Sequence, residues 1–227
     1  MRKYAVIVAG GIGSRMGADK PKQFLEVNGK PIVQITVEKF LEAFEDIEII
    51  VVLPEQHQKT GEKILAADIE LNKVITTTGG ETRFHSVKKG LSLVPENAIV
   101  FVHDAVRCLV SAELIKRCFE SALENGNAIP AIEVKDSIRV ETEDGFQIAD
   151  RSRLRIIQTP QTFFSNSIKR AFEQEYHESF TDEATVAETF GIKIHLVKGE
   201  EQNIKITNPF DLQIASFHLT AEGAEKP

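Results

Sequence analysis

A glycine-rich segment near the amino end has the residue types needed to bind an anionic ligand. Residues 9–17 read AGGIGSRMG, and Gly10, Gly11 and Gly13 let the backbone approach a ligand with its N–H groups turned inward. A dinucleotide-binding loop would need an acidic residue about 20 residues further on, where the next strand ends. That strand is expected to end only near residue 53. A Walker A loop would need Lys followed by Ser or Thr after the glycine, but Ala18 follows here.

Three cations accompany this loop. Arg15 lies within it, and Lys20 and Lys22 follow in the sequence KPKQFL at residues 20–25. Cations held against developing negative charge are what phosphoryl and nucleotidyl transfer require. The alternative is a basic turn that is merely solvated. The segment favours a phosphate-binding site in a chain that is acidic elsewhere.

Two further clusters could contribute to the same site. Residues 78–86, TGGETRFHS, join two glycines to a helix start, where anions bind well, although an ordinary strand-to-helix turn has the same pattern. Residues 103–107, HDAVR, follow an apolar run, and ligands of open α/β sheets lie at the carboxyl ends of strands. A surface Asp–Arg pair is the alternative there, and His103 is interpreted as structural. The six histidines show no metal-ligand spacing, so no protein-held metal is predicted.

Short apolar runs alternate with amphipathic stretches along the chain. The runs predict strands at residues 4–9, 47–53, 73–77, 99–103, 128–134 and 193–197. The amphipathic stretches predict helices at residues 31–44, 55–67, 82–93, 111–123, 166–175, 181–190 and 209–219. This alternation predicts an α/β fold with a single Rossmann-like, mainly parallel twisted sheet flanked by helices.

Residues 134–155 interrupt the alternation. Two short alternating runs flank Glu143-Asp144-Gly145, which is typical of a β-hairpin turn. A charged hairpin inserted into a parallel α/β chain is either a solvated edge or an arm that packs on a second subunit. Pattern alone leaves both open.

Composition limits the class of protein. The 227 residues include 27 Lys and Arg against 34 Asp and Glu, a formal net charge of −7, which argues against a nucleic-acid-binding protein. Two cysteines and no CxxC pair suggest reduced thiols in a cytoplasmic protein. The first apolar run is too short for a membrane span, so no membrane partner is expected. Residues 1–220 are predicted to form one domain with the arm 134–155 inserted, followed by a flexible tail at 221–227.

Taken in order, these segments resemble the 2-C-methyl-D-erythritol 4-phosphate cytidylyltransferase family of the non-mevalonate isoprenoid pathway. The resemblance covers residues 4–219 and rests on AGGIGSRMG, PKQFL, GGETRFHSV, HDAVR, KDSIR, DR at 150–151, QTPQTF, TDEA and NIKIT. It implies CMP transfer from CTP to methylerythritol phosphate in a homodimer whose hairpin arms interlock. Mg²⁺ would be held mainly by the CTP phosphates, and the arm would bring Ser137 and Arg151 to the neighbour's site.

The resemblance also implies a role for each matching residue. The catalytic residues would be Arg15 and Lys22, on the α-phosphate. The nucleotide would be bound by Gly10, Gly11, Gly13, Gly80, Glu81, Arg83, Ser86 and Asp104. The substrate would be bound by Arg107, Ser137, Arg151, Thr159, Thr181 and Lys205. Three positions depart from the usual family pattern. Ser137 stands where the family usually has Thr, Cys108 where it has Pro, and Glu81 where Asp is frequent.

Other functions fit parts of the same pattern. Ribitol-5-phosphate cytidylyltransferases look alike over the glycine loop and QTPQ, and sugar-1-phosphate nucleotidyltransferases with another base are broader relatives. A catalytically inactive nucleotide-binding module is a third alternative. The charged residues Arg15, Lys22, Asp104 and Lys205 are all present, which argues against such decay.

Overall fold

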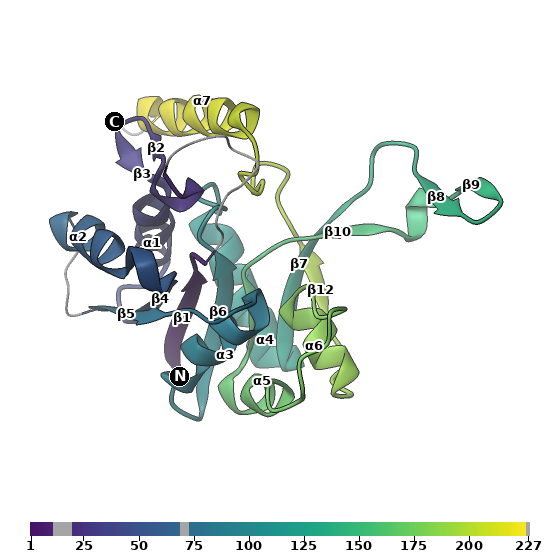
Figure 1. Ribbon diagram of the computed structural model, residues 1–227, viewed down its shortest axis with the longest axis horizontal. Helices are drawn as coiled ribbons and strands as arrows, with labels where there is room; N and C mark the ends of the chain where they lie inside the picture. Colours follow the sequence, from purple (N-terminus) through teal and green to yellow (C-terminus); the bar gives the residue numbers. More distant parts are fainter. Residues whose placement is uncertain (11–19, 69–72, 226–227) are drawn as a thin grey trace.

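The computed structural model describes residues 1–10, 20–68 and 73–225, which form an α/β unit with one projecting hairpin (Figure 1). The central sheet contains β1 (Arg2–Val8), β4 (Ile47–Leu53), β5 (Val74–Thr78), β6 (Ala98–Asp104), β7 (Asn127–Glu133), β10 (Arg155–Ile157), β11 (Gln161–Phe164) and β12 (Leu196–Lys198). The α-helices are α1 (Ile32–Ala43), α2 (Gln58–Asp68), α3 (Arg83–Ser92), α4 (Ala112–Asn125), α5 (Ser165–Ala171), α6 (Glu183–Thr189) and α7 (Pro209–Glu225). The described residues also form the short 3-10 helices η2 (Lys22–Phe24), η3 (Glu55–His57) and η5 (Arg151–Arg153).

The strand order in the sheet is β10-β7-β11-β6-β1-β4-β5, with β12 also paired to β7. Strand β1 is parallel to β4 and β6, β4 is parallel to β5, and β12 is parallel to β7, which confirms the mainly parallel sheet. Strands β10 and β11 are antiparallel and were not predicted. Both are short, and their direction follows from the path of the chain returning from the hairpin. The register of β1 and β6 sets Val8 opposite Asp104 at the carboxyl ends.

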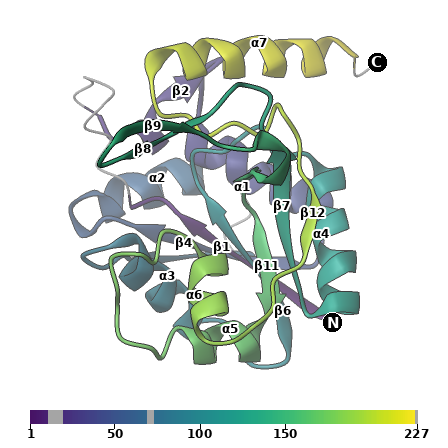
Figure 2. The same ribbon diagram turned by 90° about the vertical axis from the view of Figure 1, so that its right-hand side faces the viewer.

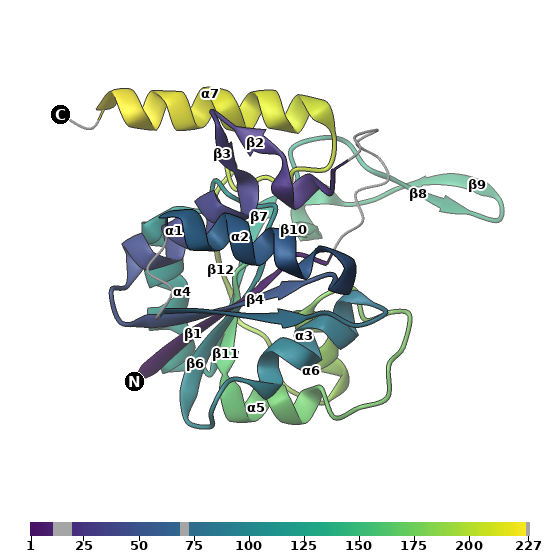
Figure 3. The ribbon, with the colours of Figure 1, turned by 60° about the vertical axis from the view of Figure 1, so that its left-hand side comes forward.

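Apolar side chains cover both faces of the central strands, because alternate residues of a strand point to opposite faces. On β1, Ala5 and Ile7 pack in one cluster with residues of α1, α2 and α4, while Tyr4 and Val6 pack in the other with residues of α3, α5 and α6. Figure 3 shows α1 and α2 on one side of the sheet and α3, α5 and α6 on the other. The continuous apolar runs in the sequence thus correspond to strands buried on both faces.

Helix α7 packs over a third, smaller apolar cluster beside the two-stranded sheet of β2 (Glu26–Val27) and β3 (Lys30–Pro31). Ala215 of α7 is buried in this cluster together with Val27, Ile32 and Ile206. The helix runs to Glu225, so residues 221–225, predicted to start a flexible tail, are helical instead. Within the described residues, no helix is both long enough and apolar enough to cross a membrane.

The hairpin predicted within residues 134–155 is present and projects from the body (Figures 1 and 2). It consists of β8 (Arg139–Thr142) and β9 (Gly145–Ile148), paired antiparallel. We call residues 134–155 the arm. Its apolar side chains are exposed: Phe146 at 71% and Ile148 at 78%.

Candidate active site

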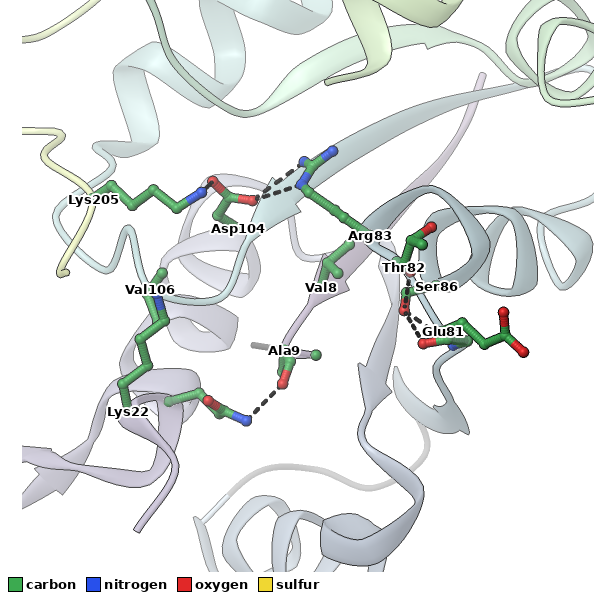
Figure 4. Close-up of a pocket in the computed structure, with 13 residues that line it drawn as sticks. Val8, Ala9, Lys22, Glu81, Thr82, Arg83, Ser86, Asp104, Val106 and Lys205 are labelled. Carbon is green, nitrogen blue, oxygen red and sulfur yellow. Dashed lines mark hydrogen bonds and ion pairs between the residues drawn. The ribbon is translucent and has the colours of Figure 1, made fainter. Parts of the chain in front are cut away.

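Asp104 is the centre of the charged cluster at the carboxyl end of β6. Its side chain is nearly buried, and three cations surround it (Figure 4 draws two of them). Arg83 donates from Nε and NH2 to Oδ1 at 3.3 and 3.2 Å. Lys205 Nζ lies 3.0 Å from Oδ2, and Arg107 Nε lies 3.5 Å from the same oxygen. Burial by itself would raise the pKa of Asp104, but Arg83, Lys205 and Arg107 outweigh it and hold the pKa well below its usual range.

Buried polar groups fix Asp104 from behind. Its backbone N–H donates to Thr159 Oγ1 at 3.1 Å, and that hydroxyl also bonds His103 Nδ1 at 2.9 Å. Burial lowers the pKa of His103 to about 3, so its ring is neutral. Arg107 donates from NH1 to the Asn203 carbonyl at 2.8 Å. Thr159 and Arg107 therefore support Asp104 from within the protein, and Thr159 is buried.

Arg83 joins this cluster from the first turn of α3. Thr82 caps that helix, its Oγ1 accepting from the His85 N–H. The guanidinium also bonds Glu183, with NH1 2.5 Å from Oε1 and NH2 3.2 Å from Oε2. Burial by itself would lower the pKa of Arg83, but the carboxylates of Glu183 and Asp104 outweigh it and raise the pKa, so the guanidinium stays charged. Burial raises the pKa of Glu183, and Arg83 acts against that rise.

The turn before α3 is closely packed. The Gly80 N–H donates to Ser86 Oγ at 3.0 Å, and Ser86 Oγ donates to the Thr82 carbonyl at the same distance. A Cβ at Gly80 would lie 2.5 Å from His85 Cβ and 3.1 Å from the His85 carbonyl carbon. No larger residue fits without moving the backbone, which explains why glycine stands at this position. The turn thereby brings its backbone to the wall of a cavity.

On the opposite side, η2 positions Lys22 and Gln23. Gln23 is buried, and its Nε2 donates to the Ala9 carbonyl at 2.6 Å, which joins η2 to the end of β1. Figure 4 shows Lys22 and Lys205 on one side of the cavity and Glu81 on the other, with Asp104 and Arg83 between them.

These elements enclose a cavity of about 190 Å³ at the carboxyl ends of β1 and β6. The residues that line it are Val8, Ala9, Gly10, Lys22, Gln23, Gly80, Glu81, Thr82, Arg83, Ser86, Asp104, Val106 and Lys205. Eight of the residues singled out from the sequence meet here, namely Gly10, Lys22, Gly80, Glu81, Arg83, Ser86, Asp104 and Lys205.

Of the remaining predicted residues, Arg107 and Thr159 contact Asp104 without lining the cavity. Gly11, Gly13 and Arg15 are outside the described residues. Ser137 and Arg151 are exposed in the arm, and Arg151 lines a separate cavity at its base with Lys135 and Arg155. Thr181 is exposed immediately before α6. Within one subunit, the described structure therefore does not bring the arm residues to the Asp104 cavity.

Reasoning from the sequence assigned no role to Gln23 or Glu183, two buried polar residues of the site. Gln23 lines the cavity, and Glu183 pairs with Arg83 from beneath it. Glu183 follows Asp182, the N-cap of α6, whose side chain accepts from the Thr185 N–H at 2.8 Å. An acidic residue in a first helical turn is ordinary, so only its complete burial marks it as unusual.

Among the described residues, no three His, Cys, Asp or Glu side chains gather in a set that could hold a metal ion. The carboxylates at the cavity are Asp104, whose oxygens already face three cations, and the exposed Glu81. This donor set fits Mg²⁺ only as an ion held mainly by a ligand's phosphates, since Mg²⁺ keeps several waters and needs few protein ligands.

A cavity lined by lysines and an arginine at the carboxyl ends of parallel strands is typical of α/β proteins that bind anionic ligands. Comparison with known proteins makes the class specific. A family model for 2-C-methyl-D-erythritol 4-phosphate cytidylyltransferase matches residues 4–221, and the chain belongs to that family. It is thus a cytidylyltransferase, a kind of nucleotidyltransferase.

Individual relatives agree over nearly the whole chain. The protein of that name from Bacteroides fragilis is 45% identical over 219 residues, covering 96% of this chain and 100% of the relative. The one from Porphyromonas gingivalis is 42% identical over 222 residues, with 97% and 99% covered. The crystal structure of 4-diphosphocytidyl-2C-methyl-D-erythritol synthase from Anaerococcus prevotii superposes with a TM-score of 0.81 at 29% identity, covering 96% of each chain.

Proposed function

We propose that this protein transfers CMP from CTP to 2-C-methyl-D-erythritol 4-phosphate, giving 4-diphosphocytidyl-2-C-methyl-D-erythritol and pyrophosphate. The family match over residues 4–221 is the observation that carries the proposal. The chemistry of the cavity supports it, because Lys22 and Lys205 line a space in which phosphates would be neutralised.

The reaction is an in-line displacement. A phosphate oxygen of the acceptor forms a bond to the α-phosphorus of CTP, and the bond from that phosphorus to the bridging oxygen breaks. Its electron pair leaves with pyrophosphate. The attacking phosphate is already an anion, so no strong general base is needed, and positioning with charge neutralisation accounts for most of the catalysis. When bound with CTP, Mg²⁺ supplies further charge neutralisation at the departing pyrophosphate.

The residues of the cavity divide between the two substrates. The turn with Gly80 and Ser86 would contact the base and ribose, and Lys22, with Arg15, would hold the α-phosphate. Lys205, beside Asp104, would face the acceptor. The ion pair of Lys205 with Asp104 at 3.0 Å keeps the ammonium at the place where the two substrates would meet.

We further propose a homodimer formed through the arm, with Ser137 and Arg151 acting in the neighbour's site. Two observations support this. Both residues lie apart from the Asp104 cavity of their own subunit, and the arm exposes Val140, Phe146 and Ile148 to solvent. Exposed apolar side chains grouped on a projecting hairpin are typical of an interaction surface. We expect the protein in the cytoplasm, where its two buried thiols would stay reduced.

A coupled assay of pyrophosphate release tests the function. We expect release with CTP, Mg²⁺ and methylerythritol phosphate together, and at least about 100-fold lower kcat/KM when ribitol 5-phosphate replaces the acceptor or UTP replaces CTP, on the scale at which a site with built polar contacts rejects a wrong partner. Efficient turnover with ribitol phosphate would make that sugar the acceptor. CTP binding without any pyrophosphate release would identify an inactive module.

A further inference from the structure

Glu183 is a fully buried carboxylate beneath the cavity, and it has no role in the reaction proposed above. Its exposure is 0%, and its hydrogen-bond partner in the described structure is the guanidinium of Arg83, 2.5 Å away. A carboxylate taken out of water is costly unless a cation compensates it, and Arg83 is the cation that compensates Glu183.

The contact with Glu183 fixes Arg83 on two sides. Nε and NH2 bond Asp104, while NH1 and NH2 bond Glu183, so every nitrogen of the guanidinium faces a carboxylate. A planar guanidinium held by two carboxylates has little freedom to rotate. Arg83 is therefore arranged to hold Asp104 in place rather than to follow the phosphates of a ligand.

The backbone around Glu183 is itself anchored to the sheet. Gln161 at the start of β11 is buried, and its Oε1 accepts from the Ala184 N–H at 2.7 Å. Its Nε2 donates to Asp182 Oδ2 at 2.9 Å. The start of α6, with Thr181 just before it, is thus joined through Glu183 and Arg83 to Asp104 at the end of β6.

We propose that Glu183 is a positioning residue for CMP transfer, which holds Arg83 so that Asp104 keeps the geometry needed where the nucleotide and the acceptor meet. The inference rests on the proposed function and names a residue of that same site. The cluster has three cations, Arg83, Arg107 and Lys205, against two carboxylates, Asp104 and Glu183, a balance of 3 − 2 = +1.

Removing the charge of Glu183 has a distinctive consequence. The cluster gains one unit of positive charge, and the NH1 edge of Arg83 is released to turn toward the triphosphate. CTP binding is then kept or strengthened, while the acceptor and the transfer step lose the fixed Asp104. A residue that only stabilised the fold would change the yield of folded protein and leave the kinetics of each folded molecule unaltered.

The test compares Glu183→Gln and Glu183→Asp with Glu188→Gln, a matched control at an exposed position of the same helix. The readouts are kcat and KM for each substrate in pyrophosphate release, the calorimetric Kd for CTP, and the thermal unfolding midpoint. For Glu183→Gln we expect kcat to fall about 10- to 100-fold, the acceptor KM to rise at least about fivefold, and the CTP Kd to stay within about twofold or to decrease, on the scale of a lost supporting contact. Glu183→Asp keeps the charge on a shorter side chain and should recover part of kcat.

The proposal is overturned if kcat and acceptor KM of folded Glu183→Gln match those of Glu188→Gln, or if CTP binding weakens as much as acceptor binding. If Glu183→Gln does not fold, the same comparison is made with Glu183→Asp. A lower kcat and a higher acceptor KM with an unchanged CTP Kd support the proposal, and equal weakening of both substrates overturns it. Failure of the proposed function is a separate result, because the unaltered protein would then release no pyrophosphate.

Discussion

The substitution Asp104→Asn removes one negative charge from the centre of the ion cluster with almost no change in shape. The Asn side chain keeps one oxygen acceptor, but its amide nitrogen replaces the other oxygen. Depending on the orientation of the amide, this nitrogen lies next to Arg83, or next to Lys205 and Arg107. Three cations then remain around a neutral side chain that is 9% exposed. We expect a loss of stability, because a buried charge cluster is disrupted when one partner is removed.

The size of the loss follows from burial. Removing one partner of a buried pair costs about 3–5 kcal/mol. The side chains of Lys205 and Arg83 are 40% and 26% exposed, so solvent screens part of the remaining repulsion and the lower end applies. A loss of about 3 kcal/mol corresponds to a decrease of about 6–12 °C in Tm, at about 2–4 °C per kcal/mol for a chain of this size.

Thermal unfolding followed by circular dichroism measures the effect, with Asp46→Asn as the matched control. Asp46 also pairs with a lysine, Lys3, at 2.7 Å, but its side chain is 69% exposed. A surface pair contributes about 0–1 kcal/mol, so the control should lose less than about 4 °C. Because the pKa of Asp104 is lowered in the folded state, its contribution is complete above the unfolded-state pKa of about 4 and is lost as the pH falls below it. If Asp104→Asn unfolds within about 2 °C of Asp46→Asn at pH 7, the cluster is not net stabilising and the reasoning fails.

Three other predictions concern catalysis, assembly and acid stability. Lys22→Ala should lower kcat by about 10²–10³-fold, the scale for one transition-state electrostatic contact. As a control, Lys20→Ala should change kcat less than about threefold, because Lys20 is exposed and does not line the cavity. Wild-type kcat in Lys22→Ala would show that Lys22 does not stabilise the transition state. Phe146→Asp on the arm should raise the dimer dissociation constant, measured by sedimentation, at least about 30-fold, the scale of an interface hot spot of about 2 kcal/mol. Leu123→Asp, at an exposed apolar position on α4, should leave that constant unchanged. Equal dissociation constants for the two variants would argue against an interface through the arm. Burial lowers the pKa of His103 to about 3, so the unfolded chain binds the extra proton between pH 6.5 and 3 and stability falls with the pH. The free energy of unfolding in urea should fall by about 2 kcal/mol between pH 8 and 5 because of this residue, and the fall should be smaller in His103→Gln. If the free energy of unfolding of His103→Gln depends on pH as steeply as that of the unaltered protein, the assignment is wrong.

Much of this protein could be predicted from the sequence, because local patterns carry the information. The apolar run of β1 predicts a strand buried on both faces, and Ser111 predicts the start of α4, where its side chain accepts from the Leu114 N–H at 2.9 Å. The α/β fold, the hairpin and the placement of Lys22, Gly80 and Asp104 at one cavity follow from such patterns together with the strand-end rule for ligands.

Other features depend on contacts between distant segments. Residues 83 and 183 are 100 positions apart, and only the folded chain shows that Arg83 meets Glu183. Asp104 could be expected at a strand end with Arg107 three residues further on, but Arg83 and Lys205 reach it from distant segments. The antiparallel direction of β11 likewise follows from the route of the chain after the arm. Hydrophobic periodicity and capping act over a few residues, so the local sequence determines the helices and strands. Burial and charge pairing are properties of the assembled interior, and only they place Glu183, Thr159 and Lys205 around Asp104.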